Sequence, residues 1–204
     1  MNIALVDYGA GNLPSVERAL TRLGMESRRA STPEALASCD ALILPGVGHF
    51  GALMRSLTER SLVKPLRDAV SAGVPLLGIC LGLQAMFATS DEAPGDAGLN
   101  LFPQNVSALP PTDRLPHMGW NQLRRVRQSK LLEGVPADAY FYFAHSYAAL
   151  EAGEASVALC DHSASFVAVL EQGNIFATQF HPEKSGPVGA KILSNFMQYA
   201  DGKG

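Results

Sequence analysis

The sequence is poor in several features that mark large classes of proteins. It contains 3 cysteines among 204 residues, an odd number without a Cys-x-x-Cys spacing, which argues against both a disulfide framework and a structural zinc site. No apolar run is long enough to cross a membrane. The start of the chain lacks the charged and apolar regions of a signal peptide. We therefore expect a cytoplasmic protein.

The chain also carries little net charge. The chain has 16 Lys and Arg against 19 Asp and Glu, a net charge of −3, and its densest basic patch covers only residues 124–127. This distribution argues against a nucleic-acid surface. The spacings of histidine that bind metals are missing, so we expect neither a metal nor a cofactor. Hydrophobic residues make up 47% of the chain. This composition and length suit one globular domain over residues 1–204.

The order of apolar segments predicts an α/β fold. We expect strands at 2–7, 26–29, 41–44 and 74–79, with helices at 13–23, 33–38 and 62–72 between them. Continuous apolar strands between helices indicate a largely parallel sheet with helices on both faces. The second half adds strands at 123–126, 139–144, 156–161, 166–170 and 174–179, which makes the sheet mixed. An amphipathic helix that packs on the sheet closes the chain.

The most informative segment is Gly78-Ile79-Cys80-Leu81-Gly82, where an apolar strand passes into a helix. Flanking glycines permit a sharp turn there, with the cysteine at its apex in a strained backbone conformation. Such a turn raises the sulfur above the carboxyl ends of the strands, where sites in parallel sheets lie. The helix N-terminus favours thiolate over thiol. Cys80 is therefore a candidate nucleophile, although an isolated cysteine between glycines is more often only a buried residue.

A base and an orienting group follow about a hundred residues later, on a segment after another predicted strand. Proline at 182 biases His181 toward an extended conformation, in which residues two apart point to the same side. The Glu183 carboxylate can then hold one imidazole nitrogen of His181, leaving the other to take a proton from Cys80. This arrangement predicts a catalytic triad of Cys80, His181 and Glu183.

The loop after the strand at 41–44 formally matches the dinucleotide pattern Gly-x-Gly-x-x-Gly at residues 46–51. We discount that interpretation, because the next strand ends at Cys80 and not in a ribose-binding acid. Gly46 and Gly48 instead let the backbone approach a substrate closely. The amide of Val47, with that of Leu81, can donate to an oxyanion. The glycines on either side permit the Val47 peptide to rotate, so we hypothesise that this oxyanion hole is gated.

Together these motifs resemble the class I (triad) glutamine amidotransferases. Four further segments are similar to the glutaminase subunits of imidazole glycerol phosphate synthases, at residues 7–13, 45–48, 116–121 and 145–147, and so is the segment 179–185. The resemblance implies a flavodoxin-like fold and hydrolysis of glutamine through a thioester on Cys80. It also implies that glutamine is held by Gln84 and by His145, Ser146 and Tyr147.

The same resemblance implies a partner. Glutaminases of this kind dock as a heterodimer on a (β/α)8-barrel cyclase, which uses the ammonia to make imidazole glycerol phosphate and an aminoimidazole carboxamide ribonucleotide. We expect Asn12, Trp120 and Asn121 to lie in loops at the edge that carries Cys80, where a tryptophan can anchor an interface.

Three alternatives remain at this point. A thiol hydrolase on the same fold is disfavoured because residue 81 is leucine, where such enzymes often have histidine. The glutaminase of another pathway is disfavoured by the segment 117–121. A non-catalytic scaffold is disfavoured by the intact Cys80, His181 and Glu183, since the loss of one such residue costs several orders of magnitude in rate.

Overall fold

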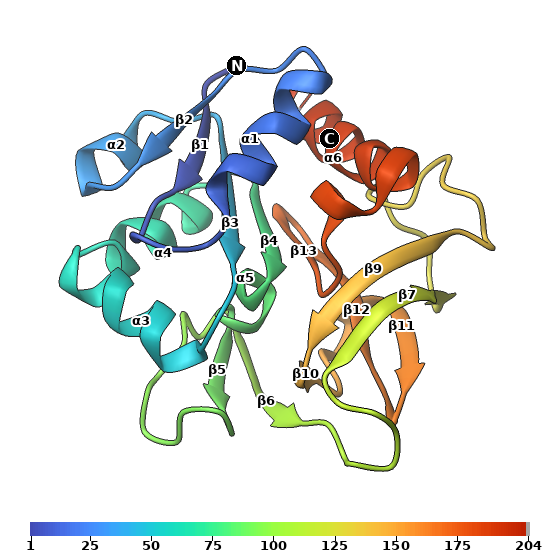
Figure 1. Ribbon diagram of the computed structural model, residues 1–204. Helices are drawn as coiled ribbons and strands as arrows, with labels where there is room; N and C mark the ends of the chain where they lie inside the picture. The colour runs from blue at the N-terminus through green and yellow to red at the C-terminus, as the bar shows by residue number, and fades with distance from the viewer. Residues whose placement is uncertain (203–204) are drawn as a thin grey trace.

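The computed structural model describes residues 1–202, and its elements alternate as the sequence predicts in the first half (Figure 1). The elements are β1 (Ile3–Val6), α1 (Leu13–Arg22), β2 (Ser27–Ala30), α2 (Pro33–Ala37), β3 (Ala41–Gly46), α3 (Phe50–Glu59), α4 (Val63–Ser71), β4 (Leu76–Cys80), α5 (Leu81–Gln84), β5 (Phe87–Ser90), β6 (Phe102–Ala108), β7 (His117–Gln122), β8 (Arg124–Arg125), β9 (Tyr140–His145), β10 (Tyr147–Ala149), η1 (Gly153–Ala155), β11 (Ser156–His162), β12 (Ala164–Gln172), β13 (Ile175–Thr178), η2 (Pro182–Lys184) and α6 (Gly186–Gly202).

A mixed sheet organises these elements. Within residues 1–202 it has eight strands in the order β2-β1-β3-β4-β13-β12-β11-β8. Strands β2, β1, β3, β4 and β13 run parallel to one another, whereas β12 pairs antiparallel with β13, β11 with β12, and β8 with β11. Smaller sheets pair β10 with β6 and β5, and β7 with β9. The predicted α/β class with a largely parallel sheet is confirmed.

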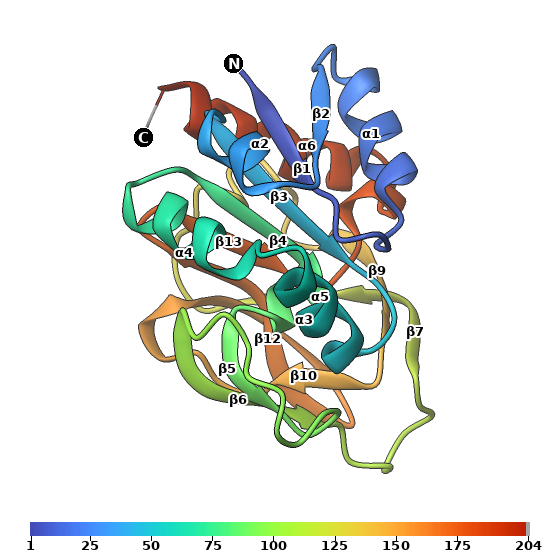
Figure 2. The ribbon, with the colours of Figure 1, turned by 90° about the vertical axis from the view of Figure 1, so that its left-hand side faces the viewer.

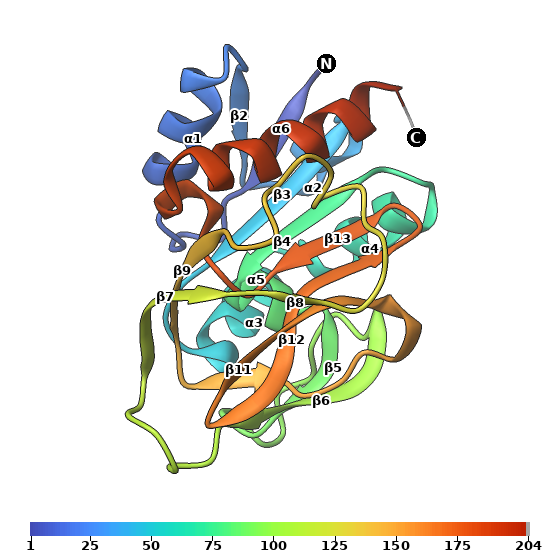
Figure 3. The ribbon, with the colours of Figure 1, turned by 90° about the vertical axis from the view of Figure 1, so that its right-hand side faces the viewer.

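Helices cover both faces of the sheet. Figure 2 looks onto the side of α3 and α4, and Figure 3 onto the opposite side, where α6 crosses the parallel strands. On α1 the buried residues Leu13, Val16 and Leu20 recur with helical spacing, so one stripe of the helix faces the sheet. The core on that side also contains Phe196 of α6, and the core on the other side is built around Phe50 of α3.

The structure differs from the sequence prediction in the middle of the chain. Helix α3 and strands β5, β6, β7 and β10 were not predicted. Trp120 and Asn121 lie within β7, so the expectation that they occupy loops is wrong. The pattern of β7 is the reverse of a normal half-buried strand, because its apolar residues Met118 and Trp120 are exposed while His117 is buried. Among residues 1–202, no helix combines the length and apolarity needed to span a bilayer.

A close approach of two backbones positions the turn after β4. A Cβ atom added to Gly82 would overlap the carbonyl oxygen of Leu44, which belongs to β3. A Cβ atom added to Gly46 would lie 2.7 Å from the Gly82 nitrogen. Helix α5 therefore rests directly on the end of β3, and only glycine at these two positions permits the contact.

This contact predicts a large effect of one added methyl group. We expect Gly82→Ala to lower the free energy of unfolding by about 3 kcal/mol, because the clash is with backbone that cannot rotate away. The matched control is Gly202→Ala near the end of α6, where an added Cβ meets no atom within 4 Å. Urea denaturation of both variants measures the difference, and equal stabilities would contradict the proposed contact.

Candidate active site

Cys80 lies at the carboxyl end of β4, at the apex of the predicted turn. Its backbone angles are φ 54° and ψ −107°, a conformation that residues with side chains rarely adopt. In the sheet it pairs with Gly46 at the end of β3. The predicted strained turn is confirmed, and it directs the sulfur to the edge of the sheet where the parallel strands end.

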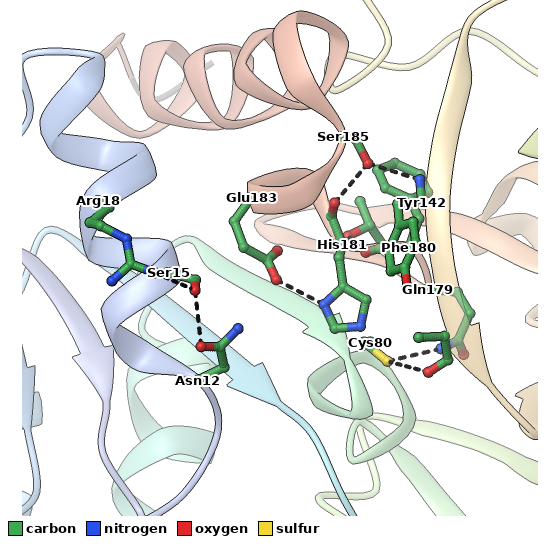
Figure 4. Close-up of polar contacts among 12 residues, drawn as sticks. Asn12, Ser15, Arg18, Cys80, Tyr142, Gln179, Phe180, His181, Glu183 and Ser185 are labelled. Atoms are coloured by element: carbon green, nitrogen blue, oxygen red, sulfur yellow. Dashed lines mark hydrogen bonds and ion pairs between the residues drawn. The ribbon is translucent and has the colours of Figure 1, made fainter. Parts of the chain in front are cut away.

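His181 reaches this sulfur from the segment after β13, the strand that pairs with β4, and Glu183 contacts His181 from the same segment (Figure 4). The His181 Nδ1 atom lies 2.8 Å from Glu183 Oε1, and both side chains are almost completely buried. His181 is extended as expected, at φ −96° and ψ 97°. Glu183, however, lies in the 3-10 turn η2, so the predicted contact forms through a tight turn and not through continued extended backbone.

The segment that carries these residues is fixed to β9. The His181 amide donates to the Tyr142 carbonyl at 2.9 Å, and the Ser185 hydroxyl donates to the His181 carbonyl at 2.7 Å. The same hydroxyl accepts a hydrogen bond from the Tyr142 amide at 3.0 Å (Figure 4). These bonds hold the imidazole so that Nδ1 faces the carboxylate and the other nitrogen faces Cys80.

Electrostatics favour the protonated imidazole of His181. Burial lowers its pKa, but hydrogen bonding and charge interactions with Cys80 and Glu183 outweigh this effect and raise the pKa from 6.5 to about 10. The sulfur also receives a hydrogen bond from the Gln179 side-chain amide at 3.6 Å. A side-chain amide and a protonated imidazole thus face the sulfur.

A cavity of about 330 Å³ opens in front of the sulfur. It is lined by Val47, Gly48, Cys80, Leu81, Gln84, Glu92, Pro116, Met118, Ala144, His145, Ser146, Tyr147, His181 and Lys184. The residues predicted to contact substrate are thus brought together, except Gly46, which lies behind the lining against α5. A larger open hollow of about 730 Å³ around Arg125 and Lys130 shares no lining residue with this cavity.

The two predicted oxyanion donors differ in their surroundings. Leu81 is the first residue of α5, directly after the sulfur. The Val47 amide approaches the buried hydroxyl oxygen of Tyr8, which has no partner that completes a hydrogen bond of normal geometry. Burial raises the pKa of Tyr8 to about 12, against a smaller lowering by the Val47 amide.

The residues predicted for a partner interface lie outside the cavity lining. Asn12 precedes α1 in a left-handed conformation, and its Oδ1 accepts a hydrogen bond from Ser15 Oγ, which in turn accepts one from Arg18 (Figure 4). Trp120 is 56% exposed on β7, next to Tyr142 of β9. Asn121 follows Trp120, with its side chain turned toward His117.

Sequence reasoning missed the roles of Glu92, Gln179 and His49. Glu92 follows β5, lines the cavity and accepts a hydrogen bond from the Phe50 amide at 2.7 Å. His49 caps α3 by accepting from the Gly51 amide at 3.1 Å. A signal for Gln179 was present, because it directly precedes the segment that carries His181.

The raised pKa gives a test of the His181 environment. We expect His181 to stay protonated through pH 8, and we expect Cys80→Ala and Glu183→Gln each to lower its pKa, since each removes a group that favours the charged form. NMR titration of the imidazole measures this, and a pKa unaffected by either change would contradict the arrangement. Because the folded pKa is raised, its stabilising contribution is complete below pH 6.5 and is lost as pH rises through about 10.

Comparison with known proteins agrees with this geometry. Residues 4–199 match the class I glutamine amidotransferase family. The HisH subunit of imidazole glycerol phosphate synthase from Methanothermobacter thermautotrophicus is 47% identical over 196 residues, which cover 96% of this chain and 98% of that one. The HisH subunit from Moorella thermoacetica is 45% identical over 195 residues, with 95% and 93% covered.

Solved structures agree in fold. A crystal structure of a glutamine amidotransferase superimposes with a TM-score of 0.78 at 21% identity, covering 98% of each chain. A putative GMP synthase protein from Thermoplasma acidophilum gives 0.76 at 21% identity, covering 100% of this chain and 95% of that one. With its match over residues 4–199 and its identity to the HisH subunits, the chain belongs to the class I glutamine amidotransferases and, within them, to the HisH family.

Proposed function

We propose that this chain is the glutaminase subunit of an imidazole glycerol phosphate synthase, with Cys80, His181 and Glu183 as its catalytic residues. The observation that carries the proposal is the position of Cys80 at a strained turn, with the buried His181–Glu183 pair facing its sulfur at the cavity. This arrangement supplies a nucleophile, a proton donor and an orienting carboxylate in one place.

The reaction follows from these positions. The Cys80 sulfur attacks the side-chain amide carbon of glutamine and forms a C–S bond. His181 protonates the amide nitrogen, the C–N bond breaks and ammonia leaves. Water then attacks the thioester while His181 takes its proton, which returns glutamate and the free thiol. Glu183 holds His181 in the required tautomer throughout.

Charge that develops on the amide oxygen needs hydrogen-bond donors. The Leu81 amide at the start of α5 is one proposed donor, and the Val47 amide is the second. The approach of the Val47 amide to the Tyr8 oxygen supports the hypothesis that this peptide rotates to complete the oxyanion hole. Gly48, at φ 98°, lies on one side of the rotating peptide.

The substrate contacts follow from the cavity lining. We propose that Gln84, His145, Ser146 and Tyr147 hold the glutamine, with the backbone of Gly48 beside it. The carboxylate of Glu92 at the same cavity suits the α-ammonium group of the substrate, because an unpaired cation in a cavity requires a counter-charge.

The ammonia has to reach a second active site, for which we propose a (β/α)8-barrel cyclase as partner in a heterodimer. The outer face of β7 and β9 supports this, because Met118 and Trp120 are 65% and 56% exposed beside Tyr142. Met118 also lines the Cys80 cavity, so the apolar face is continuous with the cavity mouth. Free cysteines at 39, 80 and 160 support a cytoplasmic location.

Glutamate release from glutamine tests the proposed activity. We expect a low rate for the chain alone and a large increase with the cyclase and its ligand. Cys80→Ala should lower the rate in the complex roughly 10⁴-fold or more, because it removes the nucleophile. The matched control is Cys39→Ala, another free cysteine, which should leave the rate unchanged. Full activity without the cyclase would instead indicate a free-standing amidase.

The proposed partner interface on the outer face of β7 and β9 has a separate test. Trp120→Ala should weaken cyclase binding about tenfold or more and reduce the activation, because a large exposed aromatic side chain is a typical interface anchor. Val126→Ala is the control, since Val126 is 47% exposed and lies outside β7 and β9. Titration calorimetry measures both affinities, and circular dichroism checks the fold. Unchanged affinity and activation in Trp120→Ala would exclude this face.

A further inference from the structure

Two buried histidines, one of which lines the cavity, take no part in the bond-making and bond-breaking steps above. His117 of β7 and His145 at the end of β9 lie opposite each other in the strand register, and His117 Nδ1 is 3.1 Å from His145 Nε2. They are 4% and 6% exposed. Burial is the main reason that the pKa falls to about 4 for His117 and about 3 for His145, with a smaller lowering from neighbouring histidines. Both rings are therefore neutral, and each has one donor and one acceptor nitrogen.

The side-chain amide of Asn121 determines the donor and acceptor nitrogens of His117. Its Oδ1 accepts from the Gln122 amide at 2.8 Å, and its Nδ2 donates to the Asp161 carbonyl at 3.2 Å. These two main-chain groups fix the orientation of the amide. The second hydrogen of Nδ2 then points to His117 Nε2, which is 3.3 Å away. His117 consequently accepts at Nε2 and carries its proton on Nδ1.

The carbonyl of Tyr147 independently determines the donor and acceptor nitrogens of His145. It lies 3.0 Å from His145 Nδ1, and since a carbonyl oxygen only accepts, Nδ1 of His145 carries the proton. His145 Nε2 is then an acceptor, as the donor on His117 requires. Both ends give the same direction, in which every hydrogen bond runs from Asn121 toward Tyr147.

The series of hydrogen bonds continues from the Tyr147 carbonyl to Cys80. The second lone pair of the Tyr147 carbonyl accepts from Gln84 Nε2 at 2.7 Å. The same Gln84 nitrogen donates to Gln179 Oε1 at 3.1 Å, and Gln179 Nε2 donates to the Cys80 sulfur. The position of one carbonyl thus sets the orientation of two amides and of the donor that faces Cys80.

We propose that His117 and Asn121 are positioning residues for the glutaminase site. By fixing the tautomer of His145 they hold the Tyr147 carbonyl, and through it the Gln84–Gln179 pair that orients a donor on the Cys80 sulfur. The ring of His162 stacks on that of His117, with the two ring centroids 4.1 Å apart. The effect on catalysis rests on the proposed function, whereas the tautomers themselves do not.

The tautomers are the first test. ¹⁵N NMR of histidine-labelled protein at pH 7 should show His117 and His145 neutral with the proton on Nδ1. A charged ring, or a proton on Nε2 of either residue, would overturn the proposal whatever the enzymatic activity is.

Asn121→Asp tests whether the direction of the hydrogen bonds through His117 and His145 affects the glutaminase site. The aspartate keeps the shape of the side chain, but its ionised carboxylate can only accept, so His117 has to donate from Nε2. We expect the NMR signature of His117 to change. We also expect the KM for glutamine in the cyclase complex to rise roughly tenfold, with a smaller change in kcat, because a buried hydrogen bond at the substrate site is mispaired.

The neighbouring residue provides a matched control. Gln122→Glu makes the same change from amide to acid one residue away. The Gln122 side chain donates to the Asp138 carbonyl and makes no hydrogen bond to His117 or His145. It should leave the tautomers of His117 and His145 unchanged, and an equal change in these tautomers would overturn the proposal. His117→Asn, which keeps a donor near the Nδ1 position, should recover much of the activity that His117→Phe loses.

The outcomes separate the two proposals. Expected tautomers in a chain that releases no glutamate would refute the proposed function and leave the hydrogen-bond polarity intact. Normal glutaminase activity in Asn121→Asp, with KM unchanged and the His117 tautomer reversed, would refute the positioning role alone.

Discussion

The contact between α5 and the end of β3 is the constraint on which the site depends. Gly82 lies directly against the Leu44 carbonyl, and Gly46 leaves room for the Gly82 amide. Because the backbones touch, the turn between β4 and α5 has no space to relax, and Cys80 is held at a positive φ. The sulfur, the Leu81 amide and the loop at Val47 are therefore placed by packing of the main chain, before any side-chain interaction contributes.

The two histidines that line the cavity have pKa values shifted in opposite directions. His181 is paired with a carboxylate and a sulfur, and its pKa is raised. His145 has carbonyl and imidazole partners, and burial lowers its pKa. Two residues of one type in the same cavity thus hold different charges across the neutral pH range, because of what their ring nitrogens face. The proton that the proposed mechanism requires is confined to His181.

The sequence was sufficient to predict the elements whose pattern agrees with burial. The parallel strands around Cys80 are continuous apolar runs, and the Gly-x-Cys-x-Gly and His-Pro-Glu segments together predicted the contacts of Cys80, His181 and Glu183. Strand β7 escaped prediction because its polarity is inverted, with Trp120 outside and His117 inside. Helix α3 was missed because the glycines at 46–51 indicate a loop, although Gly51 lies within the helix. Glu92 and the chain through Asn121 depend on long-range packing, which no local pattern encodes.

The strand order has a consequence for the nascent chain. Strands β4 and β13 are neighbours in the sheet, yet Cys80 and its hydrogen-bond donor Gln179 are 99 residues apart in sequence. The ribosome releases Cys80 long before His181, and His181 reaches the sulfur only when β13 pairs with β4. Pairing of strands so far apart in sequence is slow, because the entropy of closing the long connection has to be lost first. With the proposed role of His181, a chain that lacks β13 and the segment after it cannot consume glutamine, so activity begins only when synthesis is nearly finished.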